Sequence, residues 1–503
     1  MFYKKIPPKG PQNVVYSGCT PKYYRTKLQT QRVGGNMSDN STQNTKSNNN
    51  IDRVEVTNDT LTSRGGLSLF VRYLRNSALL PHLESEFGSI RKSRKGQAVT
   101  EIFKQLFCFF LDGTSRHLSH FDALKRDEGY AAAIESQPEQ MLSSHAVKRF
   151  FKAIYWPTMR VFRAVLLQLF LWRLQLVQPT LIMLGLDTMV MDNDDAQKRH
   201  GVKPTYKNRK GFQPLQLNWG GFIIDALFRA GDIHSNHGQD VEKMLRRVVG
   251  AIRKHYHADV VIVLRMDSGF FDQKLFKVFE ELQIGYICGG KLYDDVKSYV
   301  SQSDESFWGR YENSDQIWRF VELGDRRGSW KQFRRAIFCH PLCEDRQLVF
   351  EFQRPDTIIY TNLGMGSSVD ERLEACGRSD LFTPQGLIQS YHERGSDELV
   401  NRALKDFGFE QLPFKRFGHN AAFYYTMIIA FFLYEAFKLD VCSPVVKATA
   451  YATTVRRQLI DIAAKVVRHS GKIILKVTRA TIQALNFVQL WQKSSTPPRF
   501  VWH

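Results

Sequence analysis

The sequence predicts an α/β protein with a mixed-sheet core, a β-rich insertion in that core, and α-helical N- and C-terminal regions. Three observations lead to this fold class. Apolar runs that suit buried strands begin near residues 181, 212, 221 and 258, and a helical pattern precedes the last of them. Residues 284–360 are rich in strand-forming and aromatic residues. The segments on both sides have helical periodicity and many cations.

The composition is that of a basic globular protein. Lys and Arg number 70 against 50 Asp and Glu, which gives a formal charge of +20 over 503 residues. This balance is typical of proteins that meet phosphate backbones, although a basic ribosomal or membrane-surface protein would share it. Seven cysteines without regular spacing indicate a reducing compartment and no disulfide framework. Cys339, His340 and Cys343 lack a second pair of suitably spaced ligands, which argues against zinc.

The longest apolar run, residues 421–434, is predicted to be a buried helix. It is shorter than the roughly 20 residues that cross a bilayer. It also continues directly into Glu435. We therefore expect no membrane partner.

The N-terminal part divides into a tail and a helical domain. Residues 1–60 are polar and are expected to form a disordered tail. Residues 61–178 are expected to form a helical DNA-binding domain and connector, with helices at 67–74, 79–87, 98–111, 144–154 and 158–178. Ser143 or Ser144 can cap the 144–154 helix, from which Lys148 and Arg149 would contact DNA. A structural bundle with a solvated basic face is the alternative.

Residues 179–283 are expected to form the first part of the core. A strand at 181–191 carries Asp187, strands follow at 212–217 and 221–230, and a helix at 239–255 leads to a strand at 258–266 that ends before Asp267. A three-stranded meander, a crossover helix and a strand parallel to the first form the order of a ribonuclease H-like core. Parallel neighbours lie about 4.8 Å apart. The two carboxylates are therefore predicted to be close enough to share metal.

The remaining chain completes the core and adds a basic region. Residues 284–380 are expected to form the β-rich insertion, and residues 381–440 the second part of the core. Residues 441–503 are expected to form a basic helical region. Its cations include Arg456, Arg457, Lys465, Arg468, Lys472, Lys476 and Arg479.

One predicted helix, within residues 383–408, separates polar from apolar side chains. At about 100° per residue one side holds Tyr391, Arg394, Glu398 and Lys405. The opposite side holds Leu399, Val400, Ala403, Leu404 and Phe407. Thr383 can cap the helix, Pro384 suits its first turn and Gly408 its end, while Gly395-Ser396 can split it in two. An aromatic ring, two cations and a carboxylate on one face suit a polyanion together with a metal ion.

Two strand-borne aspartates and a helix-borne glutamate match the needs of a two-metal phosphoryl-transfer site. Asp187, Asp267 and Glu398 are therefore the predicted catalytic residues and metal ligands, with Mg²⁺ or Mn²⁺ favoured by the hard oxygen donors. Arg394 can grip a phosphate through two hydrogen bonds, and Lys405 adds a point charge. The predicted DNA contacts are Tyr391, Arg394 and Lys405, and Lys207, Arg209 and Lys210 in the basic 198–210 loop.

The chain resembles the bacterial insertion-sequence transposases of the DDE superfamily, in the group with a Tyr-Arg-Glu-Lys signature. Tyr391, Arg394, Glu398 and Lys405 reproduce the signature spacing of two, three and six intervening residues. The segments LGLDT around Asp187, KNRKGFQPL from Lys207 and LRMDSGFF from Leu264 look like motifs of one family in this group. The resemblance covers about residues 60–480.

The resemblance implies cut-and-paste transposition: nicking at the element ends, attack of the freed 3′-hydroxyl on the opposite strand, and insertion into target DNA. It also implies double-stranded terminal inverted repeats and target DNA as partners, a dimer in a synaptic complex, and a cytoplasmic, nucleoid location. In the best-understood relatives excision passes through a DNA hairpin aided by a base flipped onto an aromatic residue. Trp308, Trp318 and Trp330 are the candidates in this chain.

Two other functions compete with this prediction. An inactive transposase would act only as a DNA-binding protein, and the presence of all three acids argues against it. A ribonuclease H-like metal-dependent nuclease would lack dedicated end-binding domains. The basic helices on both sides of the core argue against that second function.

Overall fold

A computed structural model describes residues 51, 53–90, 96–155, 158–313, 317–342 and 355–503. Asn58–His503 form one compact unit, to which the following description applies. The predicted disordered tail lies mostly outside the described residues, which exclude residues 1–50 and 52.

A nine-stranded mixed sheet, in the order β10-β11-β12-β13-β9-β8-β2-β6-β7, organises the described part of this unit. Strands β2 (Leu181–Thr188), β6 (Leu215–Trp219) and β7 (Phe222–Leu227) form an antiparallel meander. Helix α8 (Asp240–His255) then crosses over to β8 (Val261–Met266), which pairs with β2 in parallel. Strand β9 (Gly285–Gly289) adds in parallel beside β8. The predicted meander, crossover helix and parallel strand are all present.

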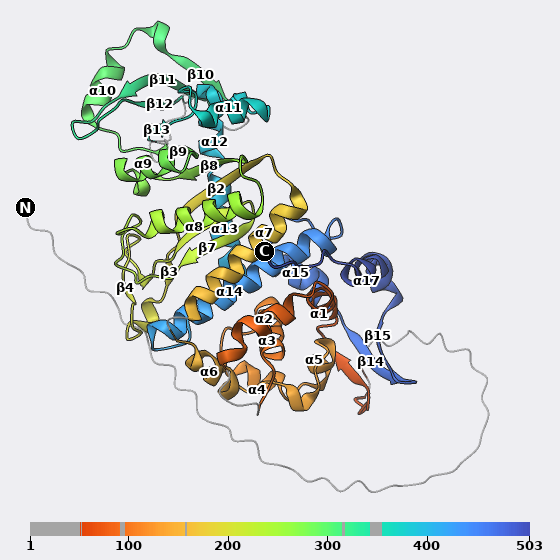
Figure 1. Cartoon of the computed structure of the whole chain (residues 1–503). Helices are drawn as coiled ribbons and strands as arrows, with labels where there is room; N and C mark the ends of the chain where they lie inside the picture. Colours follow the sequence, from red (N-terminus) through yellow and green to blue (C-terminus); the bar gives the residue numbers. More distant parts are fainter. Residues whose placement is uncertain (1–50, 52, 91–95, 156–157, 314–316, 343–354) are drawn as a thin grey trace, which may run out of the picture. The chain divides into compact units, whose positions relative to one another are not determined.

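The strand-rich region that follows extends the same sheet. Strands β10 (Gly309–Glu312), β11 (Ile317–Asp325), β12 (Arg334–Leu342) and β13 (Thr357–Thr361) pair antiparallel in sequence, and β13 pairs with β9. Figure 1 shows these strands continuing from the edge of the core. The predicted 284–380 insertion is thus strand-rich, but β9 belongs to the core order and the other strands form no separate sheet. The backbone groups at the edge of β9 find their partners in β13.

Two long helices lie between the sheet and the N-terminal helices (Figure 1). Helix α7 (Met159–Val177) packs on β7, and α14 (Phe417–Phe437) packs on both β7 and α7. In the described residues one helical segment, Phe417–Cys442, is apolar and long enough to cross a membrane, and 94% of its apolar window is buried inside the protein. The predicted buried helix at 421–434 is confirmed as the centre of this segment.

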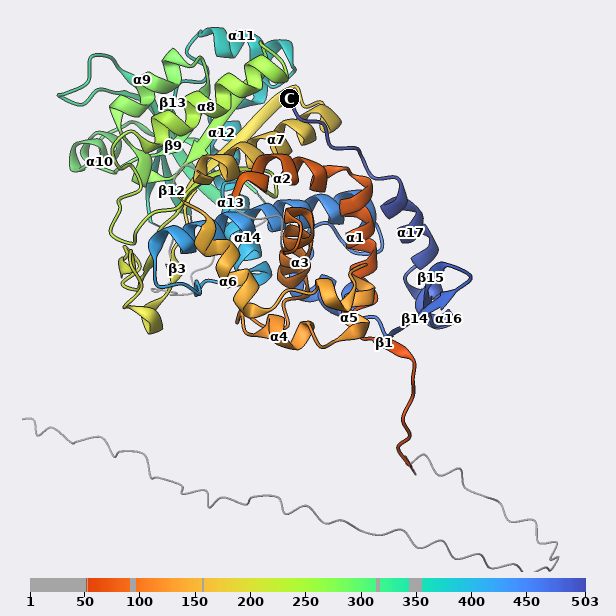
Figure 2. The same ribbon diagram turned by 60° about the horizontal axis from the view of Figure 1, so that its bottom comes forward.

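The N-terminal helices cover α14, as Figure 2 shows. They comprise α1 (Leu67–Asn76), α2 (Leu79–Phe87), α3 (Val99–Asp112), α4 (His120–Leu124), α5 (Glu128–Ala133) and α6 (Ser144–Ala153). Helices α4 and α5 were not predicted because each is too short to show a helical period. Ser143 caps α6, and its Oγ accepts a hydrogen bond from Ala146 N at 3.2 Å.

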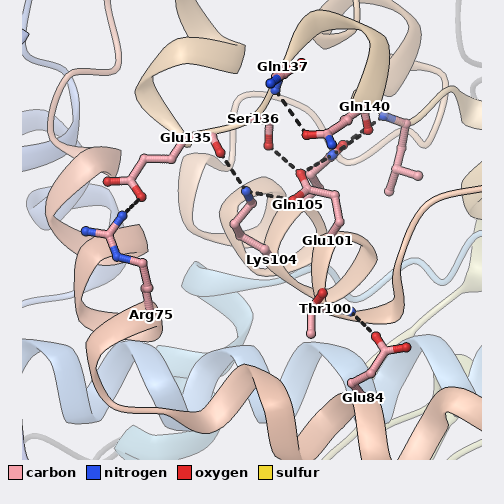
Figure 3. A network of polar contacts seen from close by, with 11 residues as sticks. Arg75, Glu84, Thr100, Glu101, Lys104, Gln105, Glu135, Ser136, Gln137 and Gln140 are labelled. Carbon is pink, nitrogen blue, oxygen red and sulfur yellow. Dashed lines mark hydrogen bonds and ion pairs between the residues drawn. The ribbon is translucent and has the colours of Figure 1, made fainter. Parts of the chain in front are cut away.

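A polar network holds the segment before α6 against α3 (Figure 3). Lys104 Nζ donates to the carbonyl of Glu135 at 3.0 Å. Gln105 donates to the carbonyl of Gln140 at 2.9 Å and accepts from Leu142 N at 2.8 Å. These side chains satisfy backbone groups that no helix pairs, and they set where α6 begins.

The C-terminal region differs from the predicted all-helical structure. Strands β14 (Ala464–His469) and β15 (Lys472–Val477) form a hairpin, which precedes α16 (Arg479–Ala484) and α17 (Phe487–Ser495). Ser470 and Gly471 have φ of 47° and 73°, as a two-residue hairpin turn requires. Strand β14 also pairs with β1 (Thr60–Thr62), so the two predicted flanking regions share one sheet.

Arg456, one of the cations of the predicted basic region, is built into the fold. Its guanidinium donates to the carbonyls of Phe110 and Leu111 in α3, and to those of Asp406 and Phe407. It therefore satisfies the carbonyls at the ends of two helices that are far apart in sequence.

Candidate active site

The first two predicted acids lie side by side at the ends of parallel strands. Asp187 is the penultimate residue of β2, and Leu186 pairs with Met266, the last residue of β8. Asp267 therefore follows immediately beside Asp187. Thr188 N donates to Asp187 Oδ1 at 2.7 Å, and Gly269 N donates to Asp267 Oδ1 at 2.9 Å. The adjacent backbone thus orients both carboxylates.

The third acid is carried by a broken helix. The predicted continuous helix divides into α12 (Pro384–His392) and α13 (Gly395–Phe407), which is the alternative that Gly395-Ser396 indicated. Thr383 caps α12 as predicted, with its Oγ1 3.1 Å from Gly386 N. The two halves of the signature therefore lie on two helices, with Tyr391 on α12 and Glu398 on α13.

The apolar face of α13 also differs from the prediction at one position. Val400, Leu404 and Phe407 are buried, as expected. Leu399 is 52% exposed instead. Asp397 takes a place in the interior, with only 4% of its surface exposed.

Helix α13 is joined directly to the first acid. Asn401 Nδ2 donates to Asp187 Oδ2 at 2.7 Å. Glu398 precedes Asn401 by three residues, so the two share one face of the helix. The three acids therefore approach one another from two strands and one helix. Asn401 was not predicted, since an Asn on a polar helix face has no distinguishing signal.

The electrostatics of Asp187 reflect this convergence. Burial raises the pKa of its carboxyl to about 6, and the negative charges of Asp267 and Glu398 add to the increase. The Thr188 N–H and the Arg394 guanidinium act in the opposite direction. A positive charge placed among the three carboxylates would lower this pKa and stabilise the ionised form.

The carboxylates are engaged by protein donors. Arg394 Nη2 lies 3.1 Å from Glu398 Oε1, and Asn401 binds Asp187. Accordingly, no group of three Asp, Glu, His or Cys side chains among the described residues is arranged to hold a metal ion. The donor set nevertheless consists of carboxylate oxygens, which fit Mg²⁺ or Mn²⁺. Arg394 contacts only Oε1 of Glu398, whose side chain is 60% exposed.

Tyr391 and Arg394 lie within this site. The Arg394 guanidinium is 5.8 Å from the centre of the Tyr391 ring. A Cβ on Gly289 would lie 2.4 Å from the Tyr391 hydroxyl oxygen, so glycine at the end of β9 leaves room for that ring. Burial raises the pKa of Tyr391. Lys405 lies further along α13 and pairs with Glu410 at 2.9 Å.

The predicted basic loop, residues 198–210, contains the short strand β4 (Lys203–Pro204) and ends at the first residue of β5 (Lys210–Phe212). These two strands pair in a small sheet with β3 (Met191–Asp192). Lys207, Arg209 and Lys210 are all exposed. Lys210 donates to Gln197 at 2.7 Å, and Arg209 lies 3.8 Å from Asp194. All three remain accessible to a ligand.

Tyr206 in this loop was missed by the sequence analysis. Its side chain is 60% exposed. Partial burial, and then the charges of Asp187, Asp267 and Glu398, raise its pKa to about 12. The phenol therefore stays protonated beside the acids and can donate a hydrogen bond there. An aromatic residue within the basic stretch KPTYKNRK was the available signal.

A buried ion pair, also not predicted, fixes α13 on the sheet. Arg265 Nη2 of β8 lies 3.1 Å from Asp397 Oδ1, and both side chains are at most 10% exposed. Arg265 Nη1 also lies 3.4 Å from the carbonyl of Ser390 at the end of α12. A Cβ on Gly185 of β2 would lie 2.6 Å from the Asp397 carboxylate. The sequence signal was an arginine within an apolar strand.

The remaining predicted residues lie elsewhere. Lys148 lines a separate cavity whose lining includes none of the three acids, and Arg149 is exposed on the same helix. Trp318 is buried, and Arg319 lies 4.4 Å from the centre of the Trp308 ring. Of the three tryptophans, Trp330 alone lines a cavity of about 610 Å³ that begins beside Asp267, at Ser268 and Gly269.

Comparisons with known proteins found a matching family model and a similar solved structure. A family model described as transposase DDE domain group 1 matches residues 43–495. No curated protein matches the chain. Among solved structures, the chain is similar to a cryo-EM structure of the piggyBac transposase synaptic complex with hairpin DNA, with 12% sequence identity, 78% of each chain covered and a TM-score of 0.39.

The Arg265–Asp397 pair is expected to dominate the stability of the site. Replacing Asp397 by Asn removes the buried counter-ion of Arg265 and leaves only the exposed Glu393, 3.8 Å away. The free energy of unfolding should fall by about 3 kcal/mol. Asp380→Asn is the matched control, because its pair with Arg378 is 41% and 53% exposed. That control should cost less than about 1 kcal/mol. Urea unfolding of both variants provides the measurement, and equal losses would contradict the prediction.

The pKa of Asp187 predicts a pH dependence of stability. The folded protein holds this proton more tightly than an ordinary Asp of pKa 3.8, so folding loses stability as the pH rises through about 6. Asp187→Asn stays neutral. Its unfolding temperature relative to wild type should therefore increase from about pH 5 to about pH 7.5 in metal-free buffer.

Asp380→Asn is again the control, because Arg378 lowers the pKa of Asp380 below 3.8. The contribution of that pair is complete throughout the same pH range, so the control difference should stay constant. A constant difference for Asp187→Asn as well would show that its carboxyl is not perturbed.

Proposed function

The chain belongs to the transposase DDE domain group 1 family, and from this premise we propose that it catalyses cut-and-paste transposition of an insertion sequence. The observation that carries the proposal is the convergence of Asp187, Asp267 and the α13 helix of Glu398. Two adjacent strand-end carboxylates with a helix-borne third meet the needs of DNA strand cleavage and 3′-hydroxyl transfer. The signature spacing favours the bacterial Tyr-Arg-Glu-Lys group.

Asp187, Asp267 and Glu398 would hold Mg²⁺ or Mn²⁺. When bound, these ions would supply activation of the attacking oxygen and stabilisation of the leaving oxygen. Arg394 pairs with only one oxygen of Glu398, which leaves Oε2 as a donor for a metal ion. The same guanidinium carries further N–H groups for a DNA phosphate. The hydroxyl of Tyr206, whose pKa is raised by partial burial and then by the same acids, can donate to a phosphate oxygen at the cut.

The partners proposed are the terminal inverted repeats of the element and target DNA, held by a dimer in a synaptic complex in the bacterial nucleoid. Tyr391, Arg394, Lys405 and the basic loop would contact the backbone close to the cut. Trp330 is the proposed platform for a flipped base in a hairpin intermediate, because it lines the cavity beside Asp267.

Replacing single acids should separate cleavage from binding. Asp187→Asn, Asp267→Asn and Glu398→Gln should each abolish metal-dependent nicking of a duplex bearing the element's terminal repeat, while its Kd changes by less than about threefold. The repeat can be read from inverted sequences flanking the gene. Nicking gels and gel shifts on the same duplex make the measurement, with Asp380→Asn as a control that retains both activities.

The outcomes distinguish the competing functions. Wild-type protein that binds the repeat but does not nick it is an inactive transposase that acts by DNA binding alone. Equal nicking of unrelated duplexes indicates a general metal-dependent nuclease. Loss of binding together with cleavage in all three variants would assign the acids a structural role.

The two signature cations should act on the backbone near the cut. Arg394→Ala and Lys405→Ala should each reduce the salt slope of DNA binding by about one unit, to a similar extent for different flanking sequences. Arg394→Lys should restore nicking incompletely, because an ammonium cannot form the two-pronged contact. Unchanged nicking with a lower unfolding temperature would mean that the pairs with Glu398 and Glu410 are purely structural.

A further inference from the structure

A basic cavity lies between the N-terminal helices and the core, separate from the three acids. Its volume is about 360 Å³. Four segments that are distant in sequence contribute its basic side chains. These are Arg116, His117, Lys148, Lys152, Arg199 and Lys415, which together define the basic groove. No Asp or Glu is among the described residues that line it.

The basic side chains of the groove have no carboxylate partner within the described part of the chain. Among the residues that the structure describes, none of the six forms an ion pair, although Arg199 donates to Asn193 Oδ1 at 2.9 Å. Arginines elsewhere at the junction of the helices and the core are neutralised. Arg163 lies 2.7 Å from Asp225, and Arg173 lies 2.8 Å from Asp440. The basic groove therefore keeps a positive charge that none of the carboxylates in the described residues balances through an ion pair.

The walls of the basic groove are held in place by buried contacts. Asn420 is fully buried, accepts from Phe414 N at 2.8 Å and donates to Phe414 O at 2.7 Å. His200 N donates to Lys415 O at 2.8 Å. The rings of Phe151 on α6 and Phe414 lie 5.5 Å apart, which joins the two walls. Because these walls are already ordered, binding a ligand there costs little further conformational entropy.

The positive charge near the basic groove affects the pKa of a neighbouring histidine, His419. His419 packs against Phe414, with ring centres 5.7 Å apart. Burial, and then the charges of Arg416 and Lys152, lower its pKa. The like charges that gather here repel one another, and a polyanion would remove that repulsion.

The basic groove adjoins a cavity that is lined by Lys405 of α13. This second cavity has a volume of about 450 Å³, shares Arg116 and Gln411 with the groove and is also lined by Arg209. Four carboxylates also line this second cavity: Asp192, Asp194, Asp195 and Glu410. These carboxylates would repel an anionic chain from the second cavity, so the chain would be held in the basic groove, with Arg116 at the shared boundary.

We propose that the basic groove binds the phosphate backbone of duplex DNA and clamps it between α6 and the core. The proposal rests on the transposase function proposed above and adds the route by which the DNA passes the N-terminal helices. The contacts are to phosphate, so they position the duplex without reading its sequence. Lys148 then serves as a backbone contact here, and Arg149, which does not line the groove, takes no part in it.

The test compares two double variants of the full-length protein. Lys152→Ala/Lys415→Ala removes two exposed cations of the basic groove. Lys243→Ala/Lys254→Ala removes two exposed lysines of α8 that line neither cavity and changes the net charge equally. Fluorescence anisotropy over a range of NaCl concentrations measures binding to two labelled duplexes of equal length, one with the terminal repeat and one unrelated. Thermal unfolding checks that both variants fold.

The groove variant should reduce the salt slope by about 1.8 units on both duplexes, whereas the α8 variant should retain the wild-type slope. Arg116→Ala should reduce it by about 0.9 units. A wild-type slope in the groove variant, or an equal reduction in the α8 variant, overturns the proposal. If the variants show the expected reductions but the wild-type protein does not nick DNA, the proposed catalytic function is overturned and the groove assignment stays intact.

Discussion

The buried ion pair between Arg265 and Asp397 is the contact on which the site depends. Arg265 lies two residues before Asp267, and Asp397 lies one residue before Glu398. Gly185, which leaves space for the Asp397 carboxylate, lies two residues before Asp187. Each element that carries an acid thus contributes one nearby residue to this contact. Because the pair is enclosed and poorly solvated, it holds both strands and the helix in one arrangement.

The pair also explains why α13 places a charged residue in the interior. Burying an aspartate against a sheet costs free energy unless an opposite charge pairs with it. Arg265 of β8 provides that charge. The same guanidinium reaches the Ser390 carbonyl at the end of α12. The break between the two helices is therefore spanned by a single side chain, and Tyr391 and Glu398 keep a defined relation despite it.

Charge is separated across the molecule in a way that suits a polyanionic substrate. The acids gather at the strand ends, where Asn401 and Arg394 satisfy them. Exposed cations lie on the 203–210 loop, and a second group of basic side chains lines the separate basic groove. Acids held close to one another repel, and their repulsion is relieved by a positive charge among them or by protonation of one carboxyl. The cations of the loop and the groove favour approach of the phosphate backbone that such a centre would cut.

The local sequence pattern was sufficient to predict an element wherever that element buries one of its faces in the core. The core strand order, the buried helix at 421–434 and the helices α1, α2, α3, α6 and α7 followed from periodicity and capping. The C-terminal hairpin was mistaken for helix because its pattern is short and its exposed strand includes Ile473 and Ile474. Pairing of β14 with β1, about 400 residues away in the chain, has no local signal.

The sequence by itself determined which residues carry the candidate chemistry, since Asp187, Asp267 and Glu398 could be chosen from strand ends and helix spacing. Tertiary structure alone decided what each of them touches. Asn401 on Asp187 and Arg265 on Asp397 are contacts between segments that no periodicity relates, and the same holds for the proximity of Tyr206 to the acids. The pair of Arg394 with Glu398, by contrast, follows from their spacing of four residues along the chain. The sequence specifies the type of each residue, whereas its partners depend on how separate elements pack. That packing also sets the pKa of the residue and the charges around it.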